Sequence, residues 1–257
     1  MRIASWNING LRARLDFLKI WLADRRPDVV GLQELKLTDE QFPHAELEKL
    51  GYQALTHGQK SWNGVAILAR EPIAPVQRGL PGQAALGARL LTGRIGDLDF
   101  TTVYCPNGKH LGHEDYPGKL AWFDDLARHL REQCDPTGAA ILCGDFNICR
   151  SAIDSWDEAG LADHIFHTAD ERQRLQQLLD WGLVDVYREI FPDKQAFSWW
   201  DYRGGAFHRK QGLRIDLMLA TRTAMARVHG AEIDRDYRKK KDGLTASDHA
   251  PVWLDLK

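Results

Sequence analysis

Short apolar runs recur along the whole chain, and they constrain its fold more than any other feature of the sequence. Each run is short for a packed helix, is rich in β-branched and aromatic residues, and is bounded by turn residues, which is typical of a β-strand. We therefore expect a protein with many strands and at least one large sheet. The runs are 2–8 (RIASWNI), 28–34 (DVVGLQE), 64–69 (GVAILA), 99–105 (DFTTVYC), 139–145 (AAILCGD), 213–220 (LRIDLMLA) and 251–257 (PVWLDLK).

Helical periodicity occurs between several of these runs, with apolar residues spaced three and four apart. This mixture fits two sheets packed face to face with helices on their outer faces. A single parallel, doubly wound sheet is the alternative. It would need a more regular alternation of strand and helix than the β-rich stretches 52–104 and 195–257 provide. The helical runs are 11–22, which stops before Pro27, then 120–130, with Pro117 at its first turn, and 175–179.

Length and composition favour one domain over residues 1–257. The chain has 257 residues, 44% hydrophobic and 27% charged, without a Ser/Gly linker, a low-complexity tract or a fixed short repeat. Polar residues within the first twenty argue against a signal-peptide core, and no apolar run approaches the roughly 18 residues of a membrane helix. The four cysteines form no C-x-x-C pair, so we expect reduced thiols in a cytoplasmic protein: Cys105, Cys134, Cys143 and Cys149.

The overall charge gives no support for non-specific nucleic-acid binding, because the formal net charge is −2 and such binders are usually basic. Two local segments differ from this average. The segment 202–214 (YRGGAFHRKQGLR) holds four Arg or Lys and no acid, and 237–241 (YRKKK) holds four more. They are either solvated loops or a patch that follows phosphates.

Polar side chains stand at the ends of the expected strands. Taken singly they are ordinary turn residues, and a lone Asp-x-Asn pattern is more often a turn than a site. Six such positions in one chain are different, because strand ends of one layer share a rim where side chains distant in sequence can converge. The six positions are Asn7 with Asn9, Glu34, Tyr104 with Asn107, Asp145 with Asn147, Asp216, and Asp248 with His249.

The residue types at these positions favour a hard cation and phosphate chemistry. Carboxylate and amide oxygens without a thiolate suit Mg²⁺ or Mn²⁺ better than zinc. In phosphodiester hydrolysis the metal neutralises the phosphate, an acid orients a water, and a cationic histidine stabilises the transition state. No Ser or Cys nucleophile is placed beside a base, and 57–64 (HGQKSWNG) lacks the spacing of a nucleotide-triphosphate loop.

Eight motifs in order resemble those of the exonuclease III family of DNA-repair nucleases, a branch of the metal-dependent endonuclease/exonuclease/phosphatase superfamily. The resemblance extends from residue 2 to residue 255. It implies a four-layer α/β sandwich of two mostly antiparallel sheets flanked by helices, with one active site on the rim. The motifs are SWNINGLRAR, DVVGLQELK, HGQKSWNGVAIL, YCPNG, GDFNI, WWDYRG, GLRIDLMLA and SDHAPVW.

The resemblance also implies roles for individual residues. The metal site would comprise Glu34 as principal ligand, Asn7, Asn9 and Asp248. The catalytic residues would be Asp145 and Asn147 at the attacking water, His249 at a phosphate oxygen with Asp216 fixing its ring, and Tyr104. Some relatives have Asp in place of Asn9, so the metal shell carries less negative charge here. The substrate would meet Asn107 at the phosphate, an apolar wall of Trp199, Leu213 and Ile215, and a basic loop with Arg203, Arg209 and Lys210.

Three functions compete on this basis. The first is a Mg²⁺-dependent DNA phosphodiesterase, acting as a monomer on double-stranded DNA, that trims 3′ ends and incises 5′ to abasic (AP) sites. The second is a superfamily phosphatase acting on a small-molecule or lipid phosphate, which should lack WWDYRG, GLRID and the basic loop. The third is a non-catalytic DNA-binding relative, which should lack a catalytic side chain. The chain contains WWDYRG, GLRID and the basic loop, and no catalytic side chain is missing, which favours the first function.

One segment departs from the family pattern. Residues 163–172 read DHIFHTADER, where abasic-site endonucleases of the family often read Gly-Phe-Thr-Pro-x-Glu-Arg or carry another small first residue. Counting back from Glu171 puts Phe166 at the place of that small residue. A flipped-out abasic sugar must enter a close-fitting pocket, and a phenylalanine at its lip would take up room. We therefore expect strong 3′-end trimming and weaker abasic-site incision, unless Phe166 points into the core.

Overall fold

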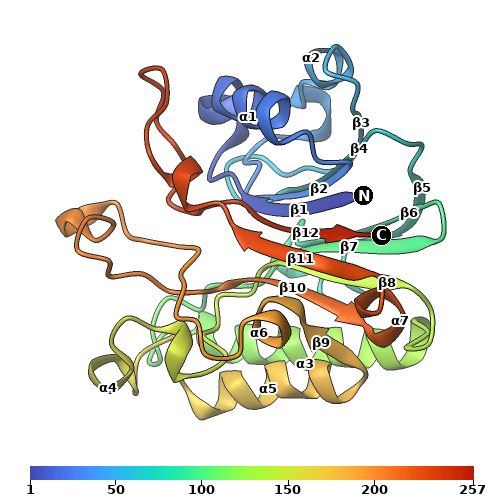
Figure 1. The fold of residues 1–257 in the computed structure, drawn as a ribbon. Coiled ribbons are helices and arrows are strands. Elements are labelled where there is room, and N and C mark those ends of the chain that lie inside the picture. The colour runs from blue at the N-terminus through green and yellow to red at the C-terminus, as the bar shows by residue number, and fades with distance from the viewer.

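The short apolar runs form strands in two six-stranded sheets of the computed structural model, which describes all residues, 1–257. The strands of the first sheet are β1 (Arg2–Asn7), β2 (Val29–Gln33), β3 (Gln53–His57), β4 (Val65–Ala69), β11 (Val228–Ile233) and β12 (Val252–Leu256). Those of the second are β5 (Ala74–Arg78), β6 (Leu90–Ile95), β7 (Leu98–Tyr104), β8 (Ala140–Asp145), β9 (Leu183–Asp185) and β10 (Asp216–Thr221). The sheets face each other and form the two middle layers of the molecule (Figure 1).

Helices cover the outer face of each sheet. In Figure 1, α1 and α2 lie above the first sheet, and α3 and α5 lie below the second. The fold is thus a four-layer α/β sandwich, as expected from the sequence. The helices are α1 (Leu11–Arg25), α2 (His44–Glu48), α3 (Asp115–Gln133), α4 (Glu158–Leu161), α5 (Ala169–Asp180), α6 (Val186–Ile190) and α7 (Arg222–Met225). Short 3₁₀ turns are η1 (Asp39–Gln41), η2 (Ala84–Leu86), η3 (Ala152–Asp154), η4 (Arg203–Gly205) and η5 (Arg235–Arg238).

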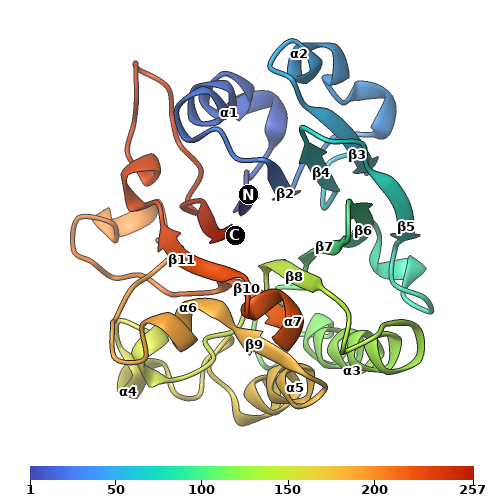
Figure 2. The same ribbon diagram turned by 45° about the vertical axis from the view of Figure 1, so that its right-hand side comes forward.

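The two sheets are built on one plan. Their strand orders are β11-β12-β1-β2-β4-β3 and β5-β6-β7-β8-β10-β9. In each sheet the two central strands are parallel and joined by a crossover helix, α1 between β1 and β2 and α3 between β7 and β8, and every other pairing is antiparallel. The carboxyl ends of β1, β2, β7 and β8 and the amino ends of β10 and β12 therefore lie on one rim. Figure 2 brings the opposite edge of the sheets forward, with the N and C termini near the centre of the view.

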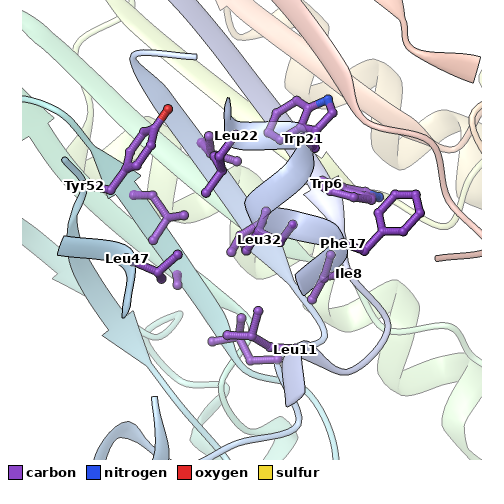
Figure 3. Close-up of a cluster of buried hydrophobic side chains, with 14 of the residues drawn as sticks. Trp6, Ile8, Leu11, Phe17, Trp21, Leu22, Leu32, Leu47 and Tyr52 are labelled. Carbon is purple, nitrogen blue, oxygen red and sulfur yellow. The ribbon is translucent and has the colours of Figure 1, made fainter. Parts of the chain in front are cut away.

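Three apolar clusters hold the layers together. One lies between the sheets and includes Ile3, Ile67 and Met218. A second lies between α3, α5 and the second sheet. The third joins α1 and α2 to the first sheet (Figure 3), where the ring centroids of Trp6 and Trp21 are 5.3 Å apart. Continuous burial of strands such as β2 and β4 on both faces follows from this layering.

The expected strands and helices all occur, with ends shifted by a few residues. The run 213–220 is the exception, because β10 begins only at Asp216 and Leu213 instead bridges Ser155 and Trp199. Strands β3, β5, β6, β9 and β11 have no separate apolar run in the sequence, and several of them lie at sheet edges. No helix is long and apolar enough to cross a bilayer.

Candidate active site

Side chains from both sheets converge on the rim. In the second sheet, Tyr104 pairs in register with Asp145, and Asp145 with Asp216, so three functional candidates lie side by side on β7, β8 and β10. In the first sheet, Asn7 ends β1, and Glu34 directly follows β2. The loop 246–251 then brings its two candidates, Asp248 and His249, to the same edge just before β12.

A carboxylate–imidazole cluster lies at the centre of this rim. One ligand atom from each of Glu34, Asp145 and His249 falls within 4.8 Å of the others. The Nδ2 group of Asn7 bridges the two acids, donating to Oε1 of Glu34 at 2.8 Å and to Oδ2 of Asp145 at 3.0 Å. Glu34 has φ 55°, which is uncommon outside glycine and is often found where a site requires it. The acids are thus held together despite their mutual repulsion.

A lysine that the sequence analysis did not single out lies against this cluster. Nζ of Lys36 is 2.9 Å from Oε2 of Glu34 and 2.7 Å from Oδ1 of Asn9. These oxygens therefore converge on a cation in this structure. The sequence shows only that Lys36 lies two residues after Glu34. This closeness does not predict that its side chain turns back to the site.

His249 is held by a buried carboxylate. Its Nδ1 lies 2.9 Å from Oδ2 of Asp216, which also accepts a hydrogen bond from Ser198 at 2.6 Å. Its Nε2 lies 3.8 Å from Oδ2 of Asp145. Burial alone would lower the pKa of His249, but the charges of Asp216 and Asp145 outweigh it and raise the pKa to about 10. His249 is therefore an imidazolium at neutral pH.

Asp145 is buried among other acids. Burial raises the pKa of Asp145 to about 7, the charges of Asp216 and Glu34 add to this, and His249 opposes it. The backbone N–H of Asn147 donates to Oδ1 of Asp145 at 2.9 Å, which fixes the carboxylate over its own turn. Asn147 has φ 51°, and its Nδ2 donates to the carbonyl of Cys105 at 3.0 Å. Asn107 reaches Oδ1 of Asn147 at 3.3 Å.

Tyr104 presents a protonated hydroxyl to this cluster. Burial raises the pKa of Tyr104 well above its ordinary value, and the charges of Glu34 and Asp145 raise it further. The guanidinium carbon of Arg89 lies 4.9 Å from the centre of the Tyr104 ring. Tyr104 can therefore donate a hydrogen bond at any physiological pH.

Asp248 stands apart from the carboxylate–imidazole cluster. Its Oδ1 accepts from Nδ2 of Asn9 at 2.8 Å, and its Oδ2 accepts from Nε1 of Trp199 at 3.0 Å. Each carboxylate oxygen of Asp248 thus accepts a hydrogen bond, one from Asn9 and one from Trp199 in the apolar wall. Asp248 connects these two parts of the rim, whereas Glu34 and Asp145 face each other directly across Asn7.

The apolar wall forms one compact cluster beside the catalytic candidates. Leu213 and Ile215 are buried, and the half-buried rings of Trp199 and Phe166 pack against them. Phe166 has φ 77°, a conformation that is strained for a bulky residue. Its ring lies 4.8 Å from Nζ of the buried Lys119, which also donates to the carbonyl of Asn147 at 2.7 Å. Phe166 thus belongs to the wall and not to the main core.

Most cations of the two basic segments form ion pairs or hydrogen bonds within the protein. They are therefore not all free to contact phosphates. Arg214 is buried and paired with Asp154 and Asp185, so it is structural. Arg203 is exposed and paired with Asp201. In the second segment, Arg238 is buried and donates to two carbonyls, while Lys239 and Lys241 pair with Asp236.

Arg209 and Lys210 have no ion pair, but they line a separate groove that contains none of the strand-end candidates. The expectation that Arg203, Arg209 and Lys210 lie on a DNA-facing loop stays a prediction, and Arg209 and Lys210 would meet DNA outside the carboxylate–imidazole cluster.

A buried ion pair was also missed by the sequence analysis. Lys119 on α3 and Glu171 on α5 are fully buried and in contact. Lys119 occupies the apolar face of α3, four residues before Phe123 and seven before Leu126. A lysine at an apolar helical position was the signal that could have identified it.

Comparisons with known proteins agree with this fold and rim. The Endonuclease/Exonuclease/phosphatase family pattern matches residues 4–249. Exodeoxyribonuclease III of Haemophilus influenzae is 35% identical over 273 residues, covering 100% of both chains. The 3′ phosphatase NExo from Neisseria, solved with a product DNA hairpin, has a TM-score of 0.96 at 36% identity and covers 100% of this chain and 99% of its own. An AP endonuclease from Archaeoglobus fulgidus has a TM-score of 0.95 at 32% identity with the same coverage.

The chain therefore belongs to the endonuclease/exonuclease/phosphatase family. Its full-length relatives are exodeoxyribonucleases and AP endonucleases, and one structural neighbour is a 3′-5′ exonuclease from Neisseria meningitidis. Within the family the protein is a DNA-repair nuclease of the exodeoxyribonuclease III and AP endonuclease type.

Proposed function

We propose that this protein is a Mg²⁺- or Mn²⁺-dependent phosphodiesterase of base excision repair that acts mainly by trimming 3′ ends of duplex DNA. The observation that supports this most directly is the cluster of Glu34, Asp145 and His249 beside the apolar wall. A charged centre next to an apolar pocket suits a phosphate attached to a sugar. The matching relatives carry nuclease names, and one was solved with a DNA product.

The donor set fits a hard divalent cation. Glu34 would hold the ion with Asn9 beside it, because the oxygens of these two residues already converge on the ammonium of Lys36. Asn7 keeps Glu34 and Asp145 at a fixed separation by donating to both, and Asp248 acts on the site through Asn9 and Trp199. When bound, the metal would neutralise phosphate charge and the charge on the leaving oxygen.

The remaining residues have complementary tasks. Asp145 accepts a proton from a water whose oxygen attacks phosphorus, the bond from phosphorus to the 3′ oxygen breaks, and the 3′ oxygen takes a proton from solvent to leave as a hydroxyl. The imidazolium of His249 donates a hydrogen bond to a non-bridging oxygen, where negative charge grows. Tyr104, Asn107 and Asn147 supply neutral donors to the same phosphate. Asp216 keeps His249 charged and correctly rotated.

A substrate panel tests this function. Duplex DNA with a recessed 3′ end, a 3′-phosphate or an internal abasic site is incubated with Mg²⁺ and, separately, with EDTA. We expect digestion of the recessed end with Mg²⁺ and none with EDTA. A small phosphomonoester in the same panel tests the alternative of a small-molecule phosphatase, and its preferential hydrolysis would overturn the DNA assignment.

We also propose that Phe166 weakens abasic-site incision relative to 3′-end trimming. The ring belongs to the sugar-facing wall and is anchored by Lys119, so it narrows the pocket that a flipped sugar would enter. A frayed 3′ end approaches with more freedom. The positive φ at Phe166 fits a position where glycine or another small residue would be unstrained.

The test compares Phe166→Gly and Phe166→Ala on both substrates. Both variants remove the ring, but only glycine relieves the backbone strain, so alanine controls for added flexibility. A selective gain in abasic-site incision by both variants, of about tenfold or more, is the expected result. Fast abasic-site incision by the wild type, or equal changes on both substrates, would contradict the proposal.

We further propose that residues 1–257 work as one catalytic domain, as a monomer and in the cytoplasm. Both sheets contribute to the one rim, which supports a single unit. The four cysteines are free, and burial raises the pKa of Cys105 and Cys143, which suits inert thiols in a reducing compartment. Sedimentation at working concentration tests the monomer.

A further inference from the structure

A second concave surface lies next to the rim. It encloses about 780 Å³ and is bordered by α6, the end of β11 and the loop that carries Arg209 and Lys210, drawn in orange at the left of Figure 1. We call it the aromatic–cationic groove, after Trp156, Phe191, Lys194, Arg209, Lys210 and Arg235 in its lining. None of the catalytic candidates lines it.

The charge of this groove is distinctive. Its four cations, Lys194, Arg209, Lys210 and Arg235, are all exposed and none forms an ion pair, and Glu232 is the one acid in the lining. This contrasts with neighbouring basic residues such as Arg203, which are neutralised by adjacent acids. Unpaired cations gathered in a concavity of a chain with net charge −2 favour a negatively charged ligand.

One exposed and one half-buried aromatic side chain accompany these cations. Trp156 is 41% exposed, although large aromatic side chains are usually covered in a folded protein. Phe191 is half-buried with Nζ of Lys194 4.7 Å from its ring centre. Rings interleaved with cations in a groove match the requirements of single-stranded nucleic acid, whose bases stack while its phosphates meet charge. An acidic peptide would leave these ring faces without a flat partner.

The groove and the sugar-facing wall are two sides of one chain segment. Trp199 faces the wall and donates to Asp248, whereas the next residue, Trp200, lines the groove. Trp156 is joined to the same layer, because its backbone N–H donates to the carbonyl of Gly212 at 3.1 Å. The groove and the wall are therefore separated by a single backbone layer.

We propose that the aromatic–cationic groove binds single-stranded DNA, namely the template strand left unpaired as the opposite strand is trimmed from its 3′ end. This rests on the proposed 3′-end trimming function. Bases of the tail stack on Trp156 and Phe191, and its phosphates meet Lys194 and Arg235. The groove thus holds the enzyme at a recessed end while the terminal nucleotide is removed.

The test compares blunt duplex with the same duplex carrying a 12-nucleotide 5′ tail of oligo(dT). Affinity is measured by fluorescence anisotropy in EDTA, and trimming is measured separately with Mg²⁺. The variants are Trp156→Ala, Trp156→Phe and Lys194→Glu. Arg131→Glu is the matched charge control, because Arg131 is exposed, has no ion pair and lies in the last turn of α3, away from the rim.

We expect the tail to tighten binding by wild type about tenfold, since base stacking and phosphate contacts add together. Trp156→Ala and Lys194→Glu should lose most of this gain, Trp156→Phe should keep it, and Arg131→Glu should behave as wild type. Removal of the first nucleotide from blunt duplex, before any tail exists, should be unchanged in all four variants. A tail that adds nothing to wild-type binding, or equal losses in Lys194→Glu and Arg131→Glu, would overturn the inference while leaving the trimming function intact.

Two further outcomes separate the alternatives. A glutamate-rich peptide of equal charge is compared with free oligo(dT). If the two bind equally tightly and Trp156→Ala weakens neither, the groove binds by charge alone and the inference is overturned. Absence of Mg²⁺-dependent trimming on every duplex would instead contradict the proposed function itself.

Discussion

Glu34 combines an unusual backbone conformation with side-chain contacts to Asn7 and Lys36. We expect Glu34→Ala to lower the rate by orders of magnitude at low Mg²⁺ and to recover part of it at high Mg²⁺, because the loss is one of metal affinity. The measurement is a Mg²⁺ titration of 3′-end trimming, supported by calorimetric titration of metal. A variant that is equally inactive at all Mg²⁺ concentrations would assign Glu34 a role other than metal binding.

Asp145 and His249 act on charge that develops during the reaction and contribute little to DNA binding. Asp145→Asn and His249→Asn should therefore each lower single-turnover rates by about 10²-fold or more, with DNA affinity within a few-fold of wild type. Quenched-flow kinetics and anisotropy measure the two quantities. If either variant loses affinity and keeps its single-turnover rate, the assigned role is wrong.

The charge of His249 depends on Asp216, which gives a prediction for pH. In the metal-free protein the pKa of His249 is raised from its ordinary 6.5 to about 10 by Asp216 and Asp145, so the imidazolium is present below that value and lost as pH rises through it. The same contact stabilises the fold below pH 6.5 and ceases to do so as pH rises through about 10. Asp216→Asn should move the alkaline limb of the pH–rate profile to lower pH, and NMR titration of the His249 ring in metal-free protein should follow it. An unchanged limb would mean that another group sets it.

At the scale of elements, α3 and α5 meet through Lys119 and Glu171, and Lys119 also donates to the carbonyl of Asn147. Lys119→Met would leave the Glu171 carboxylate buried without its cationic partner, with only Thr168 donating to it, and removing one member of such a pair costs about 3–5 kcal/mol. Chemical denaturation should show this loss. The double variant Lys119→Met/Glu171→Gln should recover part of it, and failure to do so would mean that the cost comes from packing.

The sequence predicted the elements that carry their own periodicity and missed those that depend on neighbours. Strands β2, β4 and β8 are interior strands of their sheets and are apolar on both faces, so they are recognisable as short apolar runs. Edge strand β5 is largely exposed and β9 spans only three residues, so neither has a pattern of its own.

The convergence of functional side chains on one rim could be predicted because the residues at several strand ends were considered together. The roles of the individual residues came from the family resemblance. The partners of the basic residues could not be predicted, since Arg214 meets Asp154 and Asp185 only in three dimensions. The same limitation applies to Lys36, whose direction depends on the turn after β2.

At the scale of the whole molecule, a net charge of −2 coexists with a cationic groove, so DNA binding should still depend steeply on salt. About four phosphate contacts on a duplex with a recessed 3′ end predict a slope of log K against log salt near −3 to −4, from roughly 0.9 per duplex contact. Arg209→Ala/Lys210→Ala should flatten it by about one to two units, whereas Lys49→Ala/Arg131→Ala, which removes two unpaired cations elsewhere, should not. An unchanged slope in the first variant would mean that this loop does not touch the DNA backbone.

The site joins two sheets that share no strand pairing. Asn7 of the first sheet donates to Asp145 of the second, and His249, which precedes β12, contacts Asp216 on β10. The rate of the reaction therefore depends on how the two sheets are aligned with each other. A substitution deep between the sheets, far from any DNA, can slide one sheet against the other by a fraction of a bond length and slow catalysis while both sheets remain folded. Loss of activity on gradual heating should accordingly precede loss of circular dichroism, because alignment fails before the strands do.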